Sequence, residues 1–271
     1  EFYALAAGTK SDSDVRMNFP NSHRVNTIYG EISDIDLDNQ IVSVGQTKVD
    51  YSELIIGLGC EDKYHNVPGA KEYTHSIQTL SKARETFHSI SELPKGARVG
   101  IVGAGLSGIE LASELRESRT DLEIILYDRG PRILRNFPEK LSNYIAKWFR
   151  ENNVNVVPNS LIDKVEQGTI YNNGTPEPVD IVVWTAGIQP VEIVRKLPID
   201  TNKSGRVIVN QYHQVPTYKN VYVVGDCAAL PHAPSAQLAE VQGDQIADVL
   251  KKQWNHEPLP EKMPELKVQG F

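Results

Sequence analysis

Three glycines near the middle of the chain have the spacing of a phosphate-binding loop. They form the pattern G-x-G-x-x-G within GIVGAGLSGIELASEL. In such a loop the first glycine permits a tight turn, the second lets the backbone approach a pyrophosphate, and the third lets the following helix pack closely on the strand. The start of that helix offers N–H groups and the positive end of its dipole. We expect the diphosphate of a dinucleotide to bind at Gly103, Ala104, Gly105, Leu106, Ser107 and Gly108.

An acidic residue follows this loop at the distance that a dinucleotide site requires. Asp128 lies 20 positions after Gly108, at the end of the next apolar stretch. Its carboxylate would accept hydrogen bonds from the adenosine ribose hydroxyls and would repel a 2′-phosphate, which favours NAD over NADP. Arg129 and Arg132 are close in sequence and keep NADP as the alternative. A glycine-rich corner without a ligand is the other interpretation, which the flanking strand and helix disfavour.

Two further carboxylates are candidates for contact with a cofactor. Glu110 is expected in the first turn of the helix that follows the glycines. The helix dipole would stabilise a carboxylate there, and the same position can lie beside a nicotinamide, so the residues leave both interpretations open. Gly225 and Asp226 follow the apolar stretch 221–224. Many flavoproteins present one carboxylate to the sugar-alcohol chain of the flavin in this way.

Strands and helices must alternate to position the glycine loop and its acidic partner. Strands are predicted over 98–103, 122–128 and 154–158, with helices from Leu106 and over 138–152 between them. Asn-Gly and Gln-Gly pairs then predict hairpin turns before a last apolar strand ending in WTAG. This order predicts a parallel sheet with an antiparallel appendage.

The flanking regions follow different patterns. Residues 24–59 are typical of short strands, and 77–91 of a helix that ends at Pro94-Lys95-Gly96. This Pro/Gly punctuation predicts a domain boundary. A strand ending in VYVVGD and a helix over 235–254 would return the chain to the first domain.

Composition narrows the class of protein. The 271 residues carry a net charge of −7, which disfavours a nucleic-acid partner. No apolar run approaches the length of about 20 residues that spans a bilayer. The two cysteines form no CxxC, which indicates a reducing, cytoplasmic compartment. The seven histidines show no paired spacing for a metal, so no metal site is expected.

Four stretches, in their order along the chain, resemble the two-dinucleotide-binding-domain flavoproteins. They are GIVGAGLSGIELASEL, LYDRGPRIL, VVWTAGIQP, and VYVVGDCA followed by PSAQLAEVQG. The chain looks like the type II NADH dehydrogenases of the pyridine nucleotide-disulfide oxidoreductase superfamily, which oxidise NADH through FAD and reduce a quinone. The resemblance implies an α/β fold in which a Rossmann-like NAD(H) domain, 95–210, is inserted in a partial FAD domain made of 1–94 and 211–271.

The resemblance also implies roles for single residues. On the flavin side, Asp226 after Gly225 would bind the ribityl chain of FAD, and Gln237 and Leu238 would place backbone N–H groups near the flavin pyrimidine. A helix start at that point would meet the negative charge of a reduced flavin.

On the nicotinamide side, Gly187 and Ile188 would border the ring, and Glu110 would lie near it as the candidate catalytic residue. The implied reaction is hydride transfer from NADH to FAD, in which the cofactors carry the chemistry and the protein orients them.

The chain departs from the family at the helix expected to face the quinone. The family usually places a second glutamine where this chain has Val241, and Gln242 is one step late, about 100° around a helix. The electron acceptor therefore stays open between a quinone, a protein and oxygen. A non-catalytic module that binds or senses NAD(H) is the alternative function. The lack of CxxC separates the chain from disulfide reductases.

The family's first strand–loop–helix, which holds the FAD pyrophosphate, has no counterpart in the chain. We therefore expect a piece of a longer flavoprotein, truncated at both ends, that is inactive by itself and retains FAD weakly or not at all. The full-length protein is expected in the cytoplasm, with peripheral attachment to a membrane as the family implies. A homodimer is a candidate assembly.

Overall fold

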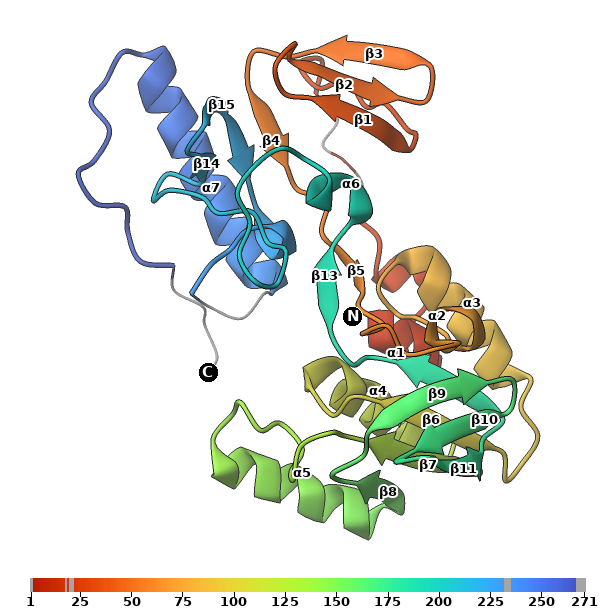
Figure 1. The fold of residues 1–271 in the computed structure, drawn as a ribbon. Helices are drawn as coiled ribbons and strands as arrows, with labels where there is room; N and C mark the ends of the chain where they lie inside the picture. The colour runs from red at the N-terminus through yellow and green to blue at the C-terminus, as the bar shows by residue number, and fades with distance from the viewer. Residues whose placement is uncertain (1, 18, 20–21, 232–234, 267–271) are drawn as a thin grey trace. The chain divides into compact units, whose positions relative to one another are not determined.

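The computed structural model describes residues 2–17, 19, 22–231 and 235–266, which fold into two compact units (Figure 1). The first unit is made of 1–19 and 62–188, and the second of 20–61 and 189–271. Strands β5 (Cys60–Asp62) and β13 (Ile188–Pro190) pair with each other where the chain passes between the units. The units are defined by packing, so the assignment of 1–94, 95–210 and 211–271 to two cofactors stays a prediction.

A four-stranded sheet forms the centre of the first unit. All its neighbouring strands are parallel, and their order is β12 (Ile181–Trp184), β6 (Arg98–Val102), β7 (Glu123–Tyr127), β8 (Val154–Val157). A separate antiparallel sheet contains β9 (Ile162–Glu166), β10 (Thr169–Asn172) and β11 (Thr175–Pro178). The predicted parallel sheet and its antiparallel appendage are both present.

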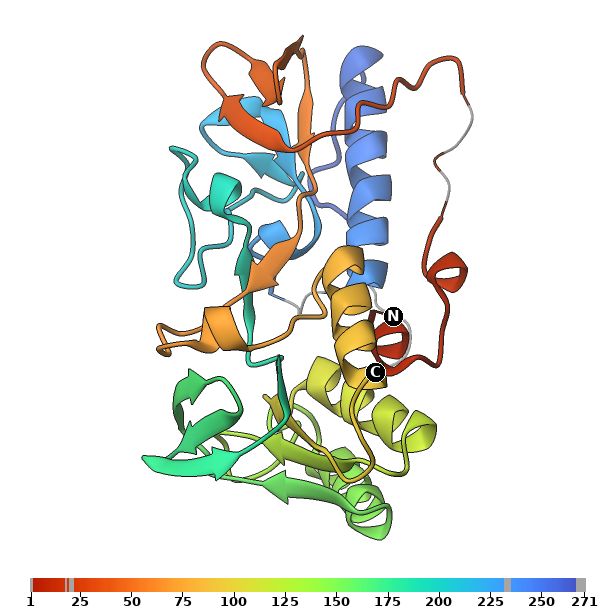
Figure 2. The same ribbon diagram turned by 90° about the vertical axis from the view of Figure 1, so that its right-hand side faces the viewer.

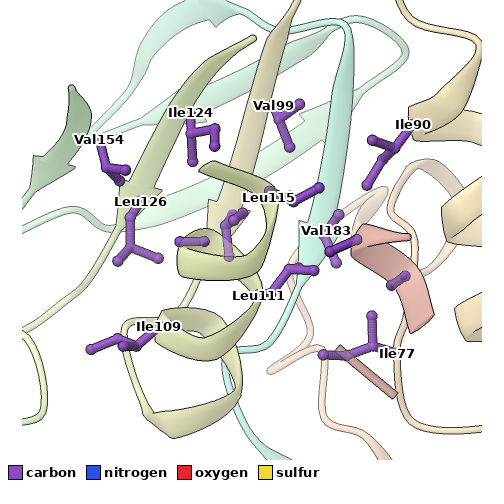
Figure 3. Packing of buried hydrophobic residues seen from close by; sticks show 14 of the residues in the cluster. Ile77, Ile90, Val99, Ile109, Leu111, Leu115, Ile124, Leu126, Val154 and Val183 are labelled. Atoms are coloured by element: carbon purple, nitrogen blue, oxygen red, sulfur yellow. The ribbon is translucent and has the colours of Figure 1, made fainter. Parts of the chain in front are cut away.

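Helices cover one face of the parallel sheet and the antiparallel strands cover the other, as Figure 2 shows. The alternation of side chains along β6 explains these layers. Ile101 packs with Leu111 and Leu115 of α4 (Leu106–Ser118), whereas Val102 packs with Ile170 of β10. Leu111 and Leu115 are fully buried (Figure 3). Truncation of either to alanine would cost about 2–5 kcal/mol.

Among the described residues, four more helices belong to this unit, and two of them differ in detail from expectation. They are α1 (Phe2–Ala7), α2 (Ala70–Tyr73), α3 (Leu80–Ser91) and α5 (Glu139–Glu151), and a 3₁₀ turn η1 spans Asp12–Asp14. Helix α3 begins three residues later than the expected 77, because the Thr79 side chain caps it by accepting from Lys82 N. Pro138 caps α5 instead of lying in its first turn.

The second unit combines two sheets with one long helix. Strands β1 (Ile32–Asp36), β2 (Ile41–Val44) and β3 (Thr47–Asp50) form an antiparallel sheet, whereas residues 23–30 form no strand. The other sheet has the order β14 (Gln214–Val215), β15 (Tyr218–Val223), β4 (Leu54–Ile56). Its helices are α6 (Glu192–Arg195), the 3₁₀ turn η2 (Gly225–Cys227) and α7 (Ala236–Trp254).

Helix α7 packs through one apolar stripe on strand β15. Ile246, Val249 and Leu250 form a buried cluster with Tyr222. The spacing of these residues, three or four along the chain, places them on one face of the helix. Within the described ranges, no helix combines the length and the apolar character that crossing a membrane requires.

Candidate functional site

The three glycines of the loop meet different surroundings. Gly103 has a φ of +108°, and a Cβ there would lie 2.7 Å from the Cα of Ala186. A Cβ on Gly108 would overlap the carbonyl oxygen of Gly103. A Cβ on Gly105 would meet nothing within 4 Å. The first and third glycines are therefore needed for packing, and the second faces open space.

That open space belongs to a cavity of about 360 Å³ at the carboxyl ends of the parallel strands. Its size lies within the range of small-molecule sites, and ligands of open α/β sheets bind at this edge. Gly105 precedes α4 without a side-chain cap, so the helix start is open toward a ligand. Five of the expected site residues line the cavity: Gly103, Ala104, Gly105, Asp128 and Gly187.

Asp128 is held in place by the backbone on both sides of it. Its Oδ2 accepts from Ala104 N at 2.8 Å, and its Oδ1 accepts from Gly130 N at 2.7 Å. Each carboxylate oxygen can accept a further hydrogen bond. The acid is thus fixed at the cavity wall with capacity left for ribose hydroxyls.

The arginines near Asp128 differ in what they can reach. Arg129 lines the cavity. Arg132 does not, because its guanidinium donates to the carbonyls of Leu134, Arg135 and Phe137. Arg135 lines the cavity, and sequence reasoning missed it. The segment 131–137 has no regular secondary structure, so no periodicity could have indicated which arginine faces the site.

The end of β12 and the residues that follow it form another wall of the cavity. Thr185 Oγ1 lies 2.9 Å from the carbonyl oxygens of Val102 and Gly103 and joins this strand end to the glycine loop. His65 lines the cavity and contacts the Ala186 carbonyl at 2.9 Å through Nε2. Sequence reasoning missed His65, since it comes from a segment far upstream of the loop. Gly187 adopts a φ of +128°, which favours glycine.

Other expected residues lie away from the cavity lining. Leu106 and Ser107 open α4, Gly108 is buried under the loop, and Ile188 starts β13. Their direct contact with a ligand stays a prediction.

Glu110 is the fifth residue of α4, and the first turn of that helix holds no acidic side chain. The expected place in the first turn is therefore wrong: the helix begins at Leu106 as predicted, and its fifth residue lies just beyond the first turn. Glu110 is half-buried, and burial raises its pKa, with the charge of Glu114 acting in the same direction. It does not line the cavity, and its role beside the nicotinamide stays a prediction.

In the second unit, Asp226 lies in the turn η2 that follows β15. Its carbonyl oxygen accepts from Arg206 Nε at 3.0 Å and from Cys60 Sγ at 3.3 Å. Its carboxylate is half-buried, and burial raises its pKa while Arg206 lowers it. Within the described part of the chain this carboxylate has no hydrogen-bond partner, so it can accept from a ligand hydroxyl.

The start of α7 offers fewer donors than expected. Ser235 caps the helix, and its side chain accepts from Leu238 N at 3.2 Å. The N–H of Leu238 is therefore already paired. Gln237 is exposed one position earlier and is the better donor of the two.

Comparisons with known proteins agree with this geometry. Residues 5–243 match the family model described as pyridine nucleotide-disulphide oxidoreductase. The NADH dehydrogenase-like protein YutJ of Bacillus subtilis is 54% identical over 271 residues, which are 100% of this chain and 76% of that protein. The type II NADH:quinone oxidoreductase of Staphylococcus aureus is 24% identical over 295 residues, 96% of this chain and 73% of that protein.

A solved structure shows the same fold. The ferredoxin reductase for the CYP199A2 system from Rhodopseudomonas palustris matches with a TM-score of 0.80 at 20% identity, over 92% of this chain and 65% of that chain. At this identity the likeness concerns the fold alone. The predicted two-dinucleotide-binding flavoprotein fold is confirmed.

Proposed function

Because the chain belongs to the pyridine nucleotide-disulphide oxidoreductase family, we propose that it functions as an FAD-dependent NADH dehydrogenase. The resemblance to type II NADH dehydrogenases is confirmed by relatives named NADH dehydrogenase-like protein and type II NADH:quinone oxidoreductase. The observation that carries the proposal is the cavity at the glycine loop, where the open face of Gly105 and the fixed carboxylate of Asp128 lie together.

NADH would lie along this cavity. The backbone of Gly103, Ala104 and Gly105 and the open start of α4 would hold its diphosphate. Asp128 would bind the adenosine ribose and disfavour a 2′-phosphate. Gly187, at the other wall, would leave room for the nicotinamide ring.

FAD is the proposed hydride acceptor. The carboxylate of Asp226, which has no hydrogen-bond partner among the described residues, suits a ribityl hydroxyl, and the N–H of Gln237 suits an acceptor atom of the flavin. These residues bind and orient the cofactor, which supplies the redox chemistry when bound.

A quinone is the proposed final acceptor, as the name of the S. aureus relative suggests. One observation favours the alternative of a non-catalytic NAD(H)-binding module. Val241 cannot hydrogen-bond a quinone carbonyl, and Gln242 next to it is fully buried. If the protein is an active enzyme that does not reduce a quinone, oxygen or a protein would be the candidate electron acceptor.

Anaerobic titration of the full-length protein with NADH in the presence of FAD tests the proposed function. We expect the absorption band of oxidised flavin to bleach as NADH is added, and a quinone analogue to restore it. Flavin that stays oxidised at saturating NADH would contradict the dehydrogenase and favour the binding module. Absence of NADH binding would contradict both.

Substitution Asp128→Ala tests the ribose contact. We expect NADH to bind more weakly by roughly 1–3 kcal/mol through lost hydrogen bonds. Reduced nicotinamide mononucleotide, which lacks the adenosine, should bind both proteins equally. Asp180→Ala is the matched control, because Asp180 also accepts from a backbone N–H, that of Arg98 at 2.7 Å, but does not line the cavity. Equal NADH affinity of Asp128→Ala and wild type would refute the assigned role.

A further inference from the structure

A buried glutamine holds the turn that carries Asp226. Gln242 of α7 is 0% exposed, and its Oε1 accepts from Gly225 N at 2.9 Å. Gly225 has a φ of +69° and begins the turn η2. One side-chain amide therefore links the long helix to the backbone immediately before Asp226.

The orientation of the Gln242 amide is fixed by the side chains that follow it, His213 and Gln245. Gln245 Nε2 donates to the Pro264 carbonyl at 2.9 Å, so its Oε1 accepts from His213 Nε2 at 2.8 Å. The ring then carries its proton on Nε2, and Nδ1 accepts from Gln242 Nε2 at 3.4 Å. This leaves Gln242 Oε1 as the acceptor for the Gly225 amide. Each nitrogen that donates in this series has at least one acceptor.

His213 is suited to a neutral state in this series. It is 3% exposed, and burial lowers its pKa. The side chains that hydrogen-bond its ring are the uncharged amides of Gln242 and Gln245, both from α7. Its backbone bonds Asn210 and Val223, and no charged group of the described residues shifts its pKa.

We propose that Gln242 is a positioning residue for the cofactor ligand Asp226, and that His213 and Gln245 orient its amide for this task. The inference rests on the proposed function, in which Asp226 binds FAD. It also assigns a role to the glutamine that departs from the family pattern at Val241 and Gln242. The Gln242 amide points into the fold and hydrogen-bonds the turn that carries Asp226. A glutamine that merely fills space would be replaceable by methionine without effect on the turn.

Amide hydrogen exchange on the whole chain tests the contact directly. In Gln242→Met we expect the Gly225 amide to exchange at least about tenfold faster than in wild type. Val224 N donates to Ile56 O and serves as the internal reference. The matched control is Gln253→Met, which removes another acceptor on α7, that of the Tyr222 hydroxyl at 2.7 Å. The control should leave the Gly225 exchange rate unchanged.

Titration of the His213 ring tests whether His213 orients the Gln242 amide or only packs against it. A protonated Nδ1 must donate, so the Gln242 amide would rotate and the Gly225 N–H would lose its acceptor. Because the folded pKa lies below the ordinary value of 6.5, the fold loses stability as the pH falls below that value, where the unfolded chain takes up the proton first. Protection of Gly225 should be constant above neutral pH and fall on acidification.

Gln242→Glu is the rescue variant. A carboxylate at this position accepts from Gly225 N–H and from a protonated His213 ring at once. We expect it to raise the His213 pKa, measured by NMR, and to retain Gly225 protection in acid that Gln242→Met has lost. A ring pKa equal in the two variants would overturn the proposed orientation.

FAD titration links the contact to the site. In the full-length protein we expect Gln242→Met to bind FAD about tenfold more weakly than Gln253→Met or wild type. Equal FAD affinity, or unchanged Gly225 exchange in Gln242→Met, overturns the inference. Failure of the full-length wild-type protein to bind FAD counts against the proposed function instead, and hydrogen exchange then still decides whether Gln242 holds the turn.

Discussion

Substitution Gly105→Val is expected to weaken NADH binding about a hundredfold, as the loss of one or two charge-assisted hydrogen bonds to the diphosphate would. The cause is steric, because the added side chain would occupy the open space in front of the loop. The fold should persist, since φ −76° and ψ −174° at Gly105 are accessible to valine. Valine is a poorer helix cap than glycine, so we expect a Tm lower by about 2–4 °C.

Fluorescence titration with NADH measures the effect, and thermal unfolding in its absence measures the cost to the fold. Asp180→Ala again serves as the control outside the cavity. Wild-type affinity in Gly105→Val would mean that the diphosphate does not approach this glycine, and the proposed placement of the nucleotide would fail.

Substitution Gly108→Ala is expected to destabilise the first unit by about 3 kcal/mol, the upper end of the usual cost of overpacking. The new Cβ would overlap the Gly103 carbonyl oxygen and lie 2.7 Å from Thr185 Oγ1. Both neighbours are held, one by the glycine turn and the other by its contacts at 2.9 Å with the carbonyls of Val102 and Gly103. The helix and the strand would therefore have to separate.

Urea unfolding measures this loss. The matched control is Gly243→Ala in α7, where a Cβ meets nothing within 4 Å. Alanine there should raise stability by up to about 1 kcal/mol through helix propensity. If Gly108→Ala unfolded at the wild-type urea concentration, the close packing of α4 on the loop would be wrong. Together the two loop variants test whether Gly105 is needed for ligand binding and Gly108 for the packing of the fold.

Local sequence signals were sufficient for the elements around the nucleotide cavity. The glycine spacing and the apolar stretches predicted the start of α4 at Leu106 and the order of β6, α4 and β7, because each signal is contained in one short segment. Asp128 could be placed for the same reason, since it directly follows β7, the neighbour in the sheet of the strand β6 that precedes the loop.

Features that depend on distant segments could not be predicted in this way. His65 reaches the cavity only because the chain after β5 returns to the end of β12. Helix α3 lies outside the predicted range 95–210, yet Ala83 and Ile90 pack in the same core as Ile101 of β6. Its amphipathic pattern indicates a buried face but carries no information on which sheet covers that face.

The two backbone tethers of Asp128 have a consequence for binding. They lock the rotamer of the carboxylate before any nucleotide arrives, so the freedom of this side chain, typically worth about 0.5–1.5 kcal/mol on immobilisation, is already lost during folding. Because one tether is Ala104 of the glycine loop, the carboxylate proposed to bind the sugar and the backbone proposed to bind the diphosphate would form one preorganised receptor. The spacing between these two contacts would then select for a ligand of matching length.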